Sequence, residues 1–196
     1  MRKLFLIMIS AIALLALSAC HGGSSDAAGE QEASPKVSDV DFSVDKGETP
    51  WAFDIEAATL SNAAYRSANW TGQNMQLVFM TLKPGETIDL ELHGGHDQFI
   101  RIEEGEALVE MGKTAENLDF RKEVEDDWAI LIPAGYWHRV ENIGSGDLKL
   151  YTLYGPAEHA YGTTHQTYEE AVEAHHDHHH GDDEEHDHAH QRLILP

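Results

Sequence analysis

Short segments of alternating polar and apolar residues fill the middle of the chain, and they restrict its fold more than any other feature. We expect β-strands over residues 75–81, 87–93, 98–103, 106–111, 118–122, 128–132, 139–142 and 148–154. Turns rich in glycine and proline separate them, for example at 83–85 and 133–135. Many short strands at near-regular spacing predict an all-β barrel or sandwich. Asp54 is placed to cap a short helix over residues 55–60 ahead of these strands.

Two stretches of this segment carry polar residues and glycines at regular spacing. The first covers residues 84–109 and contains Gly85, Glu91, His93, Gln98 and Gly105. The second covers residues 127–142 and contains Asp127, Pro133, Gly135, His138 and Asn142. The spacings resemble the first and second motifs of the cupin superfamily, in which a histidine, a glutamate and a glycine stand where this chain has Glu91, Gln98 and Asp127.

The resemblance extends to a subgroup of small single-domain cupins. Its members share stretches like those at residues 70–72, 97–107, 111–124 and 154–167. The resemblance implies an all-β fold, the cupin double-stranded β-helix or jelly-roll barrel with short flanking helices, over residues 51–174. It leaves the reaction open, because such proteins are mostly described only as cupins.

The resemblance also implies a metal site inside the barrel, held by Glu91, His93, Gln98 and His138. Strand alternation places Glu91 and His93 on one face and Ile88, Leu90 and Leu92 on the other. Two imidazoles and one carboxylate with open positions would accept divalent Fe, Mn, Ni or Zn. The alternative is a hydrogen-bonded polar cluster that fills the barrel without a metal.

Other residues are weaker candidates for the same site. His96 follows His93 across a Gly-Gly turn and could supply a ligand if the turn folds inward, although a loop position is favoured. Glu158, His159 and His165 could close over the barrel mouth or pack on the surface. Tyr151 reaches the interior only if it and Lys149, rather than Leu148 and Leu150, face inward; the sequence leaves that choice open.

The two ends of the chain predict segments outside the barrel domain. Residues 1–19 have a basic start, an apolar stretch and small residues at the end, as in a secretory signal peptide. The apolar stretch is shorter than the about 20 residues that a helix needs to span a bilayer. The sequence Leu-Ser-Ala-Cys at 17–20 resembles a bacterial lipobox, in which Cys20 is lipidated; an ordinary cleaved signal is the alternative. Residues 20–50 are then a flexible tether. An aspartate directly after Cys20 would resemble an inner-membrane retention signal. Because this chain has His21 there, we expect an outer-membrane anchor facing the periplasm.

The C-terminal segment, residues 175–196, is rich in histidine, aspartate and glutamate. We expect it to be disordered and to bind metal through neutral imidazoles beside carboxylates, with a simply solvated acidic tail as the alternative. Its histidines are His175, His176, His178, His179, His180, His186, His188 and His190.

The composition restricts the partners. Thirteen basic residues against 35 acidic ones give a formal charge of −22, which argues against nucleic acid or an anionic membrane surface. The expected partners are a metal ion and a small polar molecule, with membrane contact through the lipid anchor alone and a homodimer left open. The expected function is a metal-binding, membrane-anchored cupin. The alternatives are a metal-dependent isomerase or oxygenase of a small sugar-like substrate, and a metal-buffering protein that acts through its tail.

Overall fold

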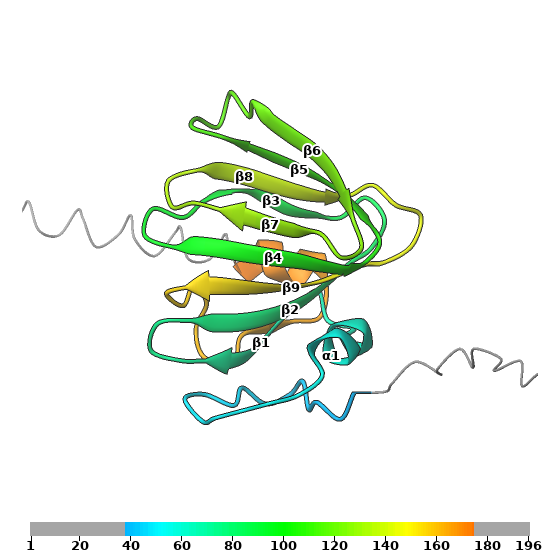
Figure 1. Ribbon diagram of the computed structural model, residues 1–196, viewed down its shortest axis with the longest axis vertical. Helices are drawn as coiled ribbons and strands as arrows, with labels where there is room; N and C mark the ends of the chain where they lie inside the picture. The colour runs from blue at the N-terminus through cyan, green and yellow to red at the C-terminus, as the bar shows by residue number, and fades with distance from the viewer. Residues whose placement is uncertain (1–37, 175–196) are drawn as a thin grey trace, which may run out of the picture. The chain divides into compact units, whose positions relative to one another are not determined.

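The computed structural model describes residues 38–174 of the chain, which form two antiparallel sheets facing one another (Figure 1). The first sheet, sheet A, has the order β10-β1-β2-β9-β4-β7, and the second, sheet B, has the order β3-β8-β5-β6. The elements are α1 (Ile55–Ser61), β1 (Arg66–Thr71), β2 (Gln76–Leu82), β3 (Thr87–Leu92), β4 (Asp97–Glu104), β5 (Glu106–Gly112), β6 (Phe120–Glu125), β7 (Ala129–Ile132), β8 (Trp137–Asn142), β9 (Leu148–Gly155) and β10 (Thr164–His165). This confirms the all-β jelly-roll prediction.

The hydrophobic core lies between the two sheets because alternate residues of the strands point inward. In β9, Leu148 and Leu150 are fully buried in this core, while Lys149 and Tyr151 face the opposite side. Val78, Met80, Ile100 and the other core residues repeat this spacing of two. The same alternation carries Thr152 and Tyr154 into the interior, so polar and aromatic groups replace aliphatic ones toward this end of β9.

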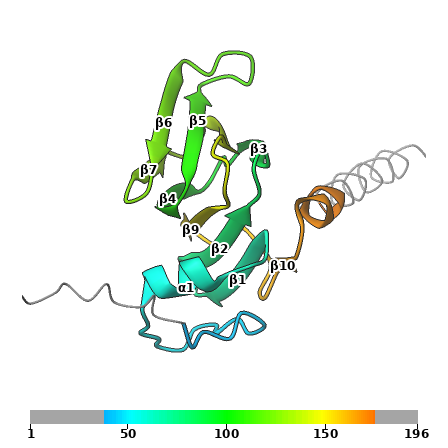
Figure 2. The same cartoon turned by 90° about the vertical axis from the view of Figure 1, so that its right-hand side faces the viewer.

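The outer face of sheet A is covered by α1 and the segment before it (Figure 2). Asp54 caps α1 as predicted, accepting a hydrogen bond from the Ala57 amide at 3.1 Å. Phe42 and Phe53 pack on Phe79 of β2 with ring centroids 5.6 and 6.2 Å apart. The structure therefore places residues 38–50, which we expected in the tether, against the domain. The physical reason is that Phe79 points away from the barrel core and needs an apolar cover.

A buried carboxylate holds this N-terminal segment in place. Asp45 accepts hydrogen bonds from the backbone N–H and the hydroxyl of Thr71 at 2.9 and 2.6 Å. It also accepts from the Gly162 N–H at 3.0 Å, so one side chain ties the segment both to β1 and to the loop before β10. The polar composition of this segment suggested a linker, because composition does not show that a polar side chain such as Asp45 is buried with its hydrogen bonds satisfied.

Strands β1 and β10 were not predicted from the sequence. Strand β1 reads Arg-Ser-Ala-Asn-Trp-Thr, and its register shifts between Ala68 and Trp70, so no alternating apolar pattern marks it. Its polar residues Ser67 and Asn69 are buried because both donate to the carbonyl of Phe42. Strand β10 has only two residues and depends on pairing with β1.

Strand β3 departs from simple alternation at a point that matters for the site. The register of β3 against β8 shifts between Ile88 and Glu91, as in a β-bulge. Ile88 is consequently buried in the core, on the side that Glu91 also faces, while Leu90 and Leu92 are exposed. The prediction that Ile88 lies opposite to Glu91 is wrong, because a bulge changes the face of every residue beyond it.

Asp127 stands where the second motif has a glycine, and its backbone conformation fits that position. It has a φ of 68°, in the left-handed region that favours glycine, so the backbone keeps the conformation that the motif's glycine would adopt. Its side chain pairs with Arg101 on β4.

The predictions for residues 1–37 and 175–196, including those for Cys20 and the tail histidines, concern positions outside the described residues. Within residues 38–174, no helix has both the length and the apolar character needed to cross a bilayer.

Candidate functional site

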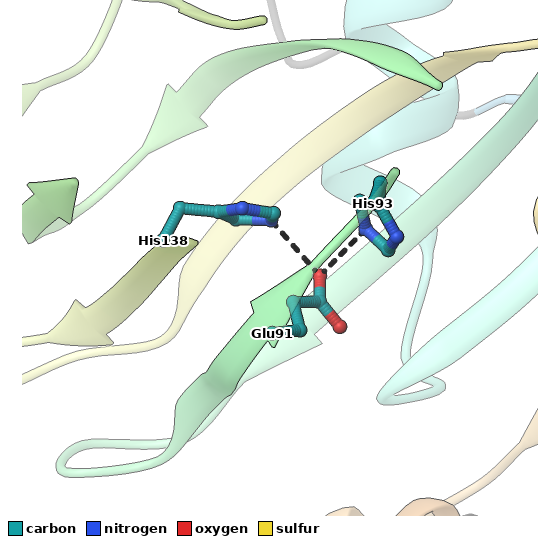
Figure 3. Close-up of side chains that lie close together, drawn as sticks. All are labelled: Glu91, His93 and His138. Atoms are coloured by element: carbon teal, nitrogen blue, oxygen red, sulfur yellow. Dashed lines mark hydrogen bonds and ion pairs between the residues drawn. The ribbon is translucent and has the colours of Figure 1, made fainter. Parts of the chain in front are cut away.

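Three of the four predicted metal ligands converge between the sheets (Figure 3). Glu91 of β3 is the register partner of His138 on β8, and His93 follows the end of β3. Glu91 Oε1 lies 3.2 Å from His93 Nε2 and 3.2 Å from His138 Nε2. The two motifs are therefore brought together by the pairing of β3 with β8.

The second motif also fixes the backbone at His93. The Gly135 N–H donates to the His93 carbonyl at 2.9 Å, and Gly135 has a φ of 76° that suits glycine. Pro133 and Gly135 thus form a turn that holds the end of β3 next to the start of β8. His138 is fully buried and His93 nearly so.

The other ring nitrogen of each histidine faces a hydrogen-bond acceptor. His138 Nδ1 lies 3.1 Å from the Tyr136 carbonyl oxygen, and His93 Nδ1 lies 3.4 Å from Glu158 Oε2. With the proton at Nδ1, facing these acceptors, a neutral ring presents its lone pair at Nε2. In that form both lone pairs face the carboxylate oxygen of Glu91, and a metal cation would satisfy all three atoms. Without a cation, a ring protonated at Nε2 can donate to Glu91 instead.

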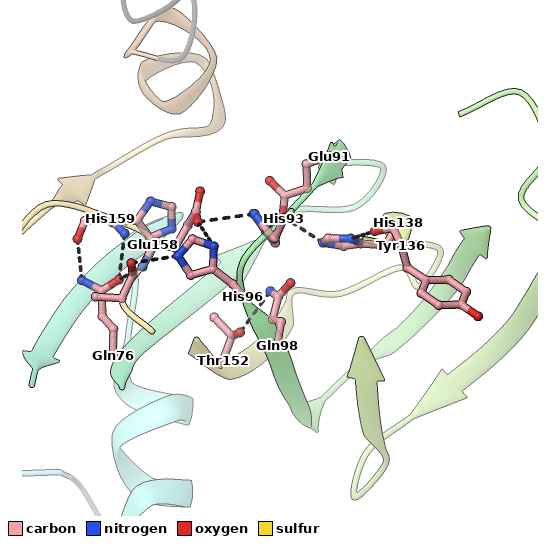
Figure 4. A network of polar contacts seen from close by, with 11 residues as sticks. Gln76, Glu91, His93, His96, Gln98, Tyr136, His138, Thr152, Glu158 and His159 are labelled. Atoms are coloured by element: carbon pink, nitrogen blue, oxygen red, sulfur yellow. Dashed lines mark hydrogen bonds and ion pairs between the residues drawn. The ribbon is translucent and has the colours of Figure 1, made fainter. Parts of the chain in front are cut away.

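Gln98 contributes a further oxygen to the interior. It is buried on β4, and its side-chain amide donates to the Thr152 hydroxyl at 3.1 Å, as Figure 4 shows. Its Oε1 atom is buried and has no hydrogen-bond partner. A buried amide oxygen without a donor fits a ligand position toward a cation, which would supply what the protein does not.

Electrostatics couple the three converging residues. Burial opposes ionisation of Glu91, but the hydrogen bonds and charges of His138 and His93 outweigh it and hold the pKa of this carboxyl well below its usual range. Burial likewise opposes protonation of His93, but the hydrogen bond that His93 donates to Glu91, together with the negative charge of Glu91, raises the pKa of that imidazole. A carboxylate anion is therefore the stable form of Glu91 at neutral pH.

Glu158 joins the site from the segment after β9 (Figure 4). Besides contacting His93, its Oε2 lies 3.1 Å from His96 Nδ1, and His96 Nε2 lies 3.1 Å from the Ala157 carbonyl. His96 thus faces inward, as one of the two sequence alternatives allowed, but it contacts Glu158 rather than Glu91. Glu158 lies where an outer carboxylate would orient a metal-binding His93.

The remaining candidates divide between the interior and the outer face. The ring of His159 packs on Tyr154 at 5.2 Å, its backbone amide donates to Gln76 Oε1 at 2.9 Å, and burial lowers its pKa to about 3. His165 lies on β10, paired with Arg66. Tyr151 lies on the outer face of sheet A beside Phe99, with ring centroids 6.1 Å apart, so its proposed place in the site is not supported.

Several groups of the barrel interior were not predicted from the sequence, including Thr152, Tyr154 and Arg66. The alternation from Leu148 and Leu150 could have placed Thr152 and Tyr154 inside, once the inward face of β9 was known. Nothing in the sequence marks Arg66, because its strand carries no recognisable pattern.

Comparison with known proteins agrees with this architecture. A cupin-domain family model matches residues 78–154. An uncharacterized protein of Bacillus subtilis, YrkC, is 47% identical over 130 residues, which cover 66% of this chain and 70% of that protein. An uncharacterized protein of Acanthamoeba polyphaga mimivirus is 42% identical over 113 residues, covering 57% of this chain and 69% of that protein.

A protein of Bacillus halodurans with a known crystal structure is also similar. It shares 49% sequence identity with a TM-score of 0.65, over 66% of this chain and 98% of that chain. Over residues 38–174, the sheets and the site define a β-barrel protein with convergent imidazole and carboxylate groups. The chain belongs to the cupin family.

Proposed function

We propose that the barrel binds one divalent transition-metal ion through Glu91, His93 and His138, with the Gln98 amide oxygen as fourth ligand. The observation that carries the proposal is the convergence of three electron-pair donors, two of which have their other ring nitrogen facing an acceptor. This is the arrangement that metal-binding histidines adopt, with Glu158 and the Tyr136 carbonyl as the outer partners. The unpartnered Gln98 oxygen supports a cation over a purely hydrogen-bonded cluster.

The donor set restricts the chemistry. Two imidazoles, one carboxylate and one amide oxygen suit Fe, Mn, Ni or Zn. A bound ion would act as a Lewis acid that polarises an oxygen of a small polar molecule. The protein's own residues would fix the imidazole orientation and exclude water, because His138 and Gln98 are buried. Binding of a small molecule at this ion is the function that we propose, and isomerisation or oxygenation of a sugar-like substrate is the catalytic alternative.

The C-terminal histidines form a second proposed metal-binding segment, which the first test must separate from the barrel. We therefore define the tail variant as the full chain with asparagine at its eight histidines, His175, His176, His178, His179, His180, His186, His188 and His190. Because these imidazoles need no fold to bind, we expect the full chain to bind several zinc ions, most of them in rapid exchange. The tail variant should retain about one tightly held ion per chain. Elemental analysis after dialysis, with calorimetric zinc titration, measures both numbers.

A result of no retained metal in the tail variant, after growth in supplemented medium, would contradict the barrel site and favour the polar cluster. The same tail variant with His138→Ala controls for weak surface sites. Equal zinc content in the full chain and the tail variant would instead contradict metal collection by the tail.

The proposal includes attachment to the bacterial cell envelope through a lipid on Cys20, which rests on the signal-like residues 1–19 and the lipobox-like sequence at 17–20. We expect Cys20→Ser to prevent lipidation, so that the protein appears in the soluble periplasmic fraction or stays unprocessed, since several acyl chains are what make such anchoring stable. Fractionation with mass spectrometry of the N-terminus measures this. Ser18→Ala, which keeps a small residue before Cys20, is the control. Cleavage and membrane association of Cys20→Ser like those of the parent would exclude the lipid anchor.

A further inference from the structure

One arginine lies on the interior side of sheet A, near the proposed metal site. Arg66 begins β1, where its Cα pairs with Met80 of β2 and with His165 of β10. Residues directly opposite in an antiparallel pair have their side chains on the same face, and Met80 is fully buried between the sheets. Arg66 and His165 therefore extend toward the barrel interior from the edge of sheet A.

Arg66 differs from the other arginines of the described residues in having no acidic partner. Arg101 pairs with Glu103 and Asp127, and Arg121 and Arg139 both pair with Glu110. Within residues 38–174, the Arg66 side chain makes no ion pair or hydrogen bond; its contact is with the Tyr65 ring, 5.6 Å from the centroid. In a chain with a formal charge of −22, a half-buried guanidinium without a carboxylate is unexpected.

Two histidines with unsatisfied ring nitrogens accompany Arg66. Arg66 Nε, His159 Nε2 and His165 Nδ1 are all buried and have no hydrogen-bond partner. His165 is the register partner of Arg66, and the His159 backbone amide donates to Gln76 on β2, the strand next to β1. Burial and the positive charge of Arg66 both lower the pKa of the two imidazoles. Buried polar groups of this kind are normally satisfied, and three of them around one cation indicate a missing partner that is both anionic and a hydrogen-bond acceptor.

This group adjoins the proposed metal site through two ring contacts. The His159 ring lies 5.2 Å from the Tyr154 ring, which lies 5.7 Å from the ring of His93. The balance of charges around the metal site also favours an anionic ligand. Glu91 and Glu158 together would balance a divalent ion, which leaves the charge of Arg66 uncompensated next to it.

We propose that Arg66, with His159 and His165, forms a subsite for the oxyanion group of a small molecule that binds beside the metal ion. The planar guanidinium suits such a group because its parallel N–H donors match two oxygens at once. The proposal rests on the proposed metal function and narrows its ligand from a polar molecule to an anionic one. A carboxylate and a phosphate share this chemistry, and the test includes both.

The test measures the binding of malonate and of inorganic phosphate by calorimetry, on the tail variant with and without one equivalent of zinc. We expect at least one of the two anions to bind the zinc-loaded protein with a Kd below about 20 mM. Arg66→Gln should weaken that binding at least about tenfold, and Arg66→Lys should weaken it less, because lysine keeps the charge but loses the fork of donors. The anion that responds to Arg66 identifies the preferred group.

Arg121→Gln is the matched control, since it removes the same charge at an exposed position while Glu110 keeps its ion pair with Arg139. It should leave anion binding within about twofold of the parent, because screening limits the effect of remote surface charges. Zinc affinity, measured separately on every variant, should stay within about threefold of the parent, as Arg66 is not a ligand. Circular dichroism verifies folding, and Arg66→Lys carries the test if Arg66→Gln does not fold.

The subsite is excluded if neither anion binds the parent, or if Arg66→Gln binds as tightly as the parent. Equal losses in Arg66→Gln and Arg121→Gln exclude it too, since they would show a general charge effect. If zinc fails to bind while an anion binds the metal-free protein through Arg66, the metal proposal fails and the oxyanion subsite remains.

Discussion

Replacing His138 by alanine in the tail variant is expected to weaken zinc binding by at least about 100-fold, more than the loss of an outer-shell partner typically costs. His138 supplies one of the three converging donor atoms, and its Nε2 lies 3.2 Å from Glu91 Oε1. Calorimetric zinc titration measures the loss. Because His138 is fully buried, circular dichroism and a second variant, His138→Gln, separate the loss of a ligand from the loss of the fold.

His96→Ala is the matched control for His138→Ala. His96 contacts Glu158 and the Ala157 carbonyl rather than Glu91, so it is one contact further from the ion than Glu158. Its removal should lower zinc affinity by about tenfold or less, at or below the smallest loss typical of an outer partner. If His138→Ala binds zinc as tightly as the parent and His96→Ala does not, the ion belongs instead to the second group of candidate ligands, formed by His93, His96 and Glu158.

Replacing Leu150 by alanine is expected to lower the free energy of unfolding by about 3 to 4 kcal/mol, within the range for leucine truncations in packed cores. Leu150 of β9 is fully buried, and its Cα pairs with Met80 on β2 and with Ile102 on β4. The strands on both sides are thereby held in place, so the truncation leaves a cavity that neither neighbour can close easily. Urea denaturation of the full chain, followed by circular dichroism, measures the change.

Leu131→Ala provides the comparison, because it makes the same truncation on β7 at a side chain that is 72% exposed. It should change the free energy of unfolding by about 0.5 kcal/mol or less. Similar losses in the two variants would show that the interior of the barrel is not the source of its stability.

The sequence predicted those parts of the fold that repeat a local pattern. Most strands between 76 and 155 follow an alternation of two, β3 with its bulge being an exception, and the helix after Asp54 follows a capping signal. Both are short-range effects. The pairing of Glu91 with His138 could be predicted only through the resemblance to a family, because no local rule states which strands become neighbours.

Features set by contacts between distant residues could not be predicted in this way. Strand β1 forms by pairing with β2 and β10, with its buried Ser67 and Asn69 satisfied by the Phe42 carbonyl. The core position of Ile88 depends on a bulge against β8. A residue of the second motif shows the difference between what the sequence and what the tertiary structure reveals. Asn142 was recognised as a motif residue, but its hydrogen bonds to the carbonyls of Leu82 and Gly146 depend on the assembled barrel.

The candidate site divides in the same way. Glu91, His93, Gln98 and His138 were identified as ligands through the resemblance of their two motifs to those of cupins, and imidazole and carboxylate groups are residue types that suit a metal. Tertiary structure alone decided that Glu158 faces His93, that Tyr151 faces outward and that Arg66 enters the interior without a partner. The physical reason is that a local pattern determines which side of a strand a residue takes, whereas the packing of the two sheets determines which side becomes the interior and which polar groups meet there.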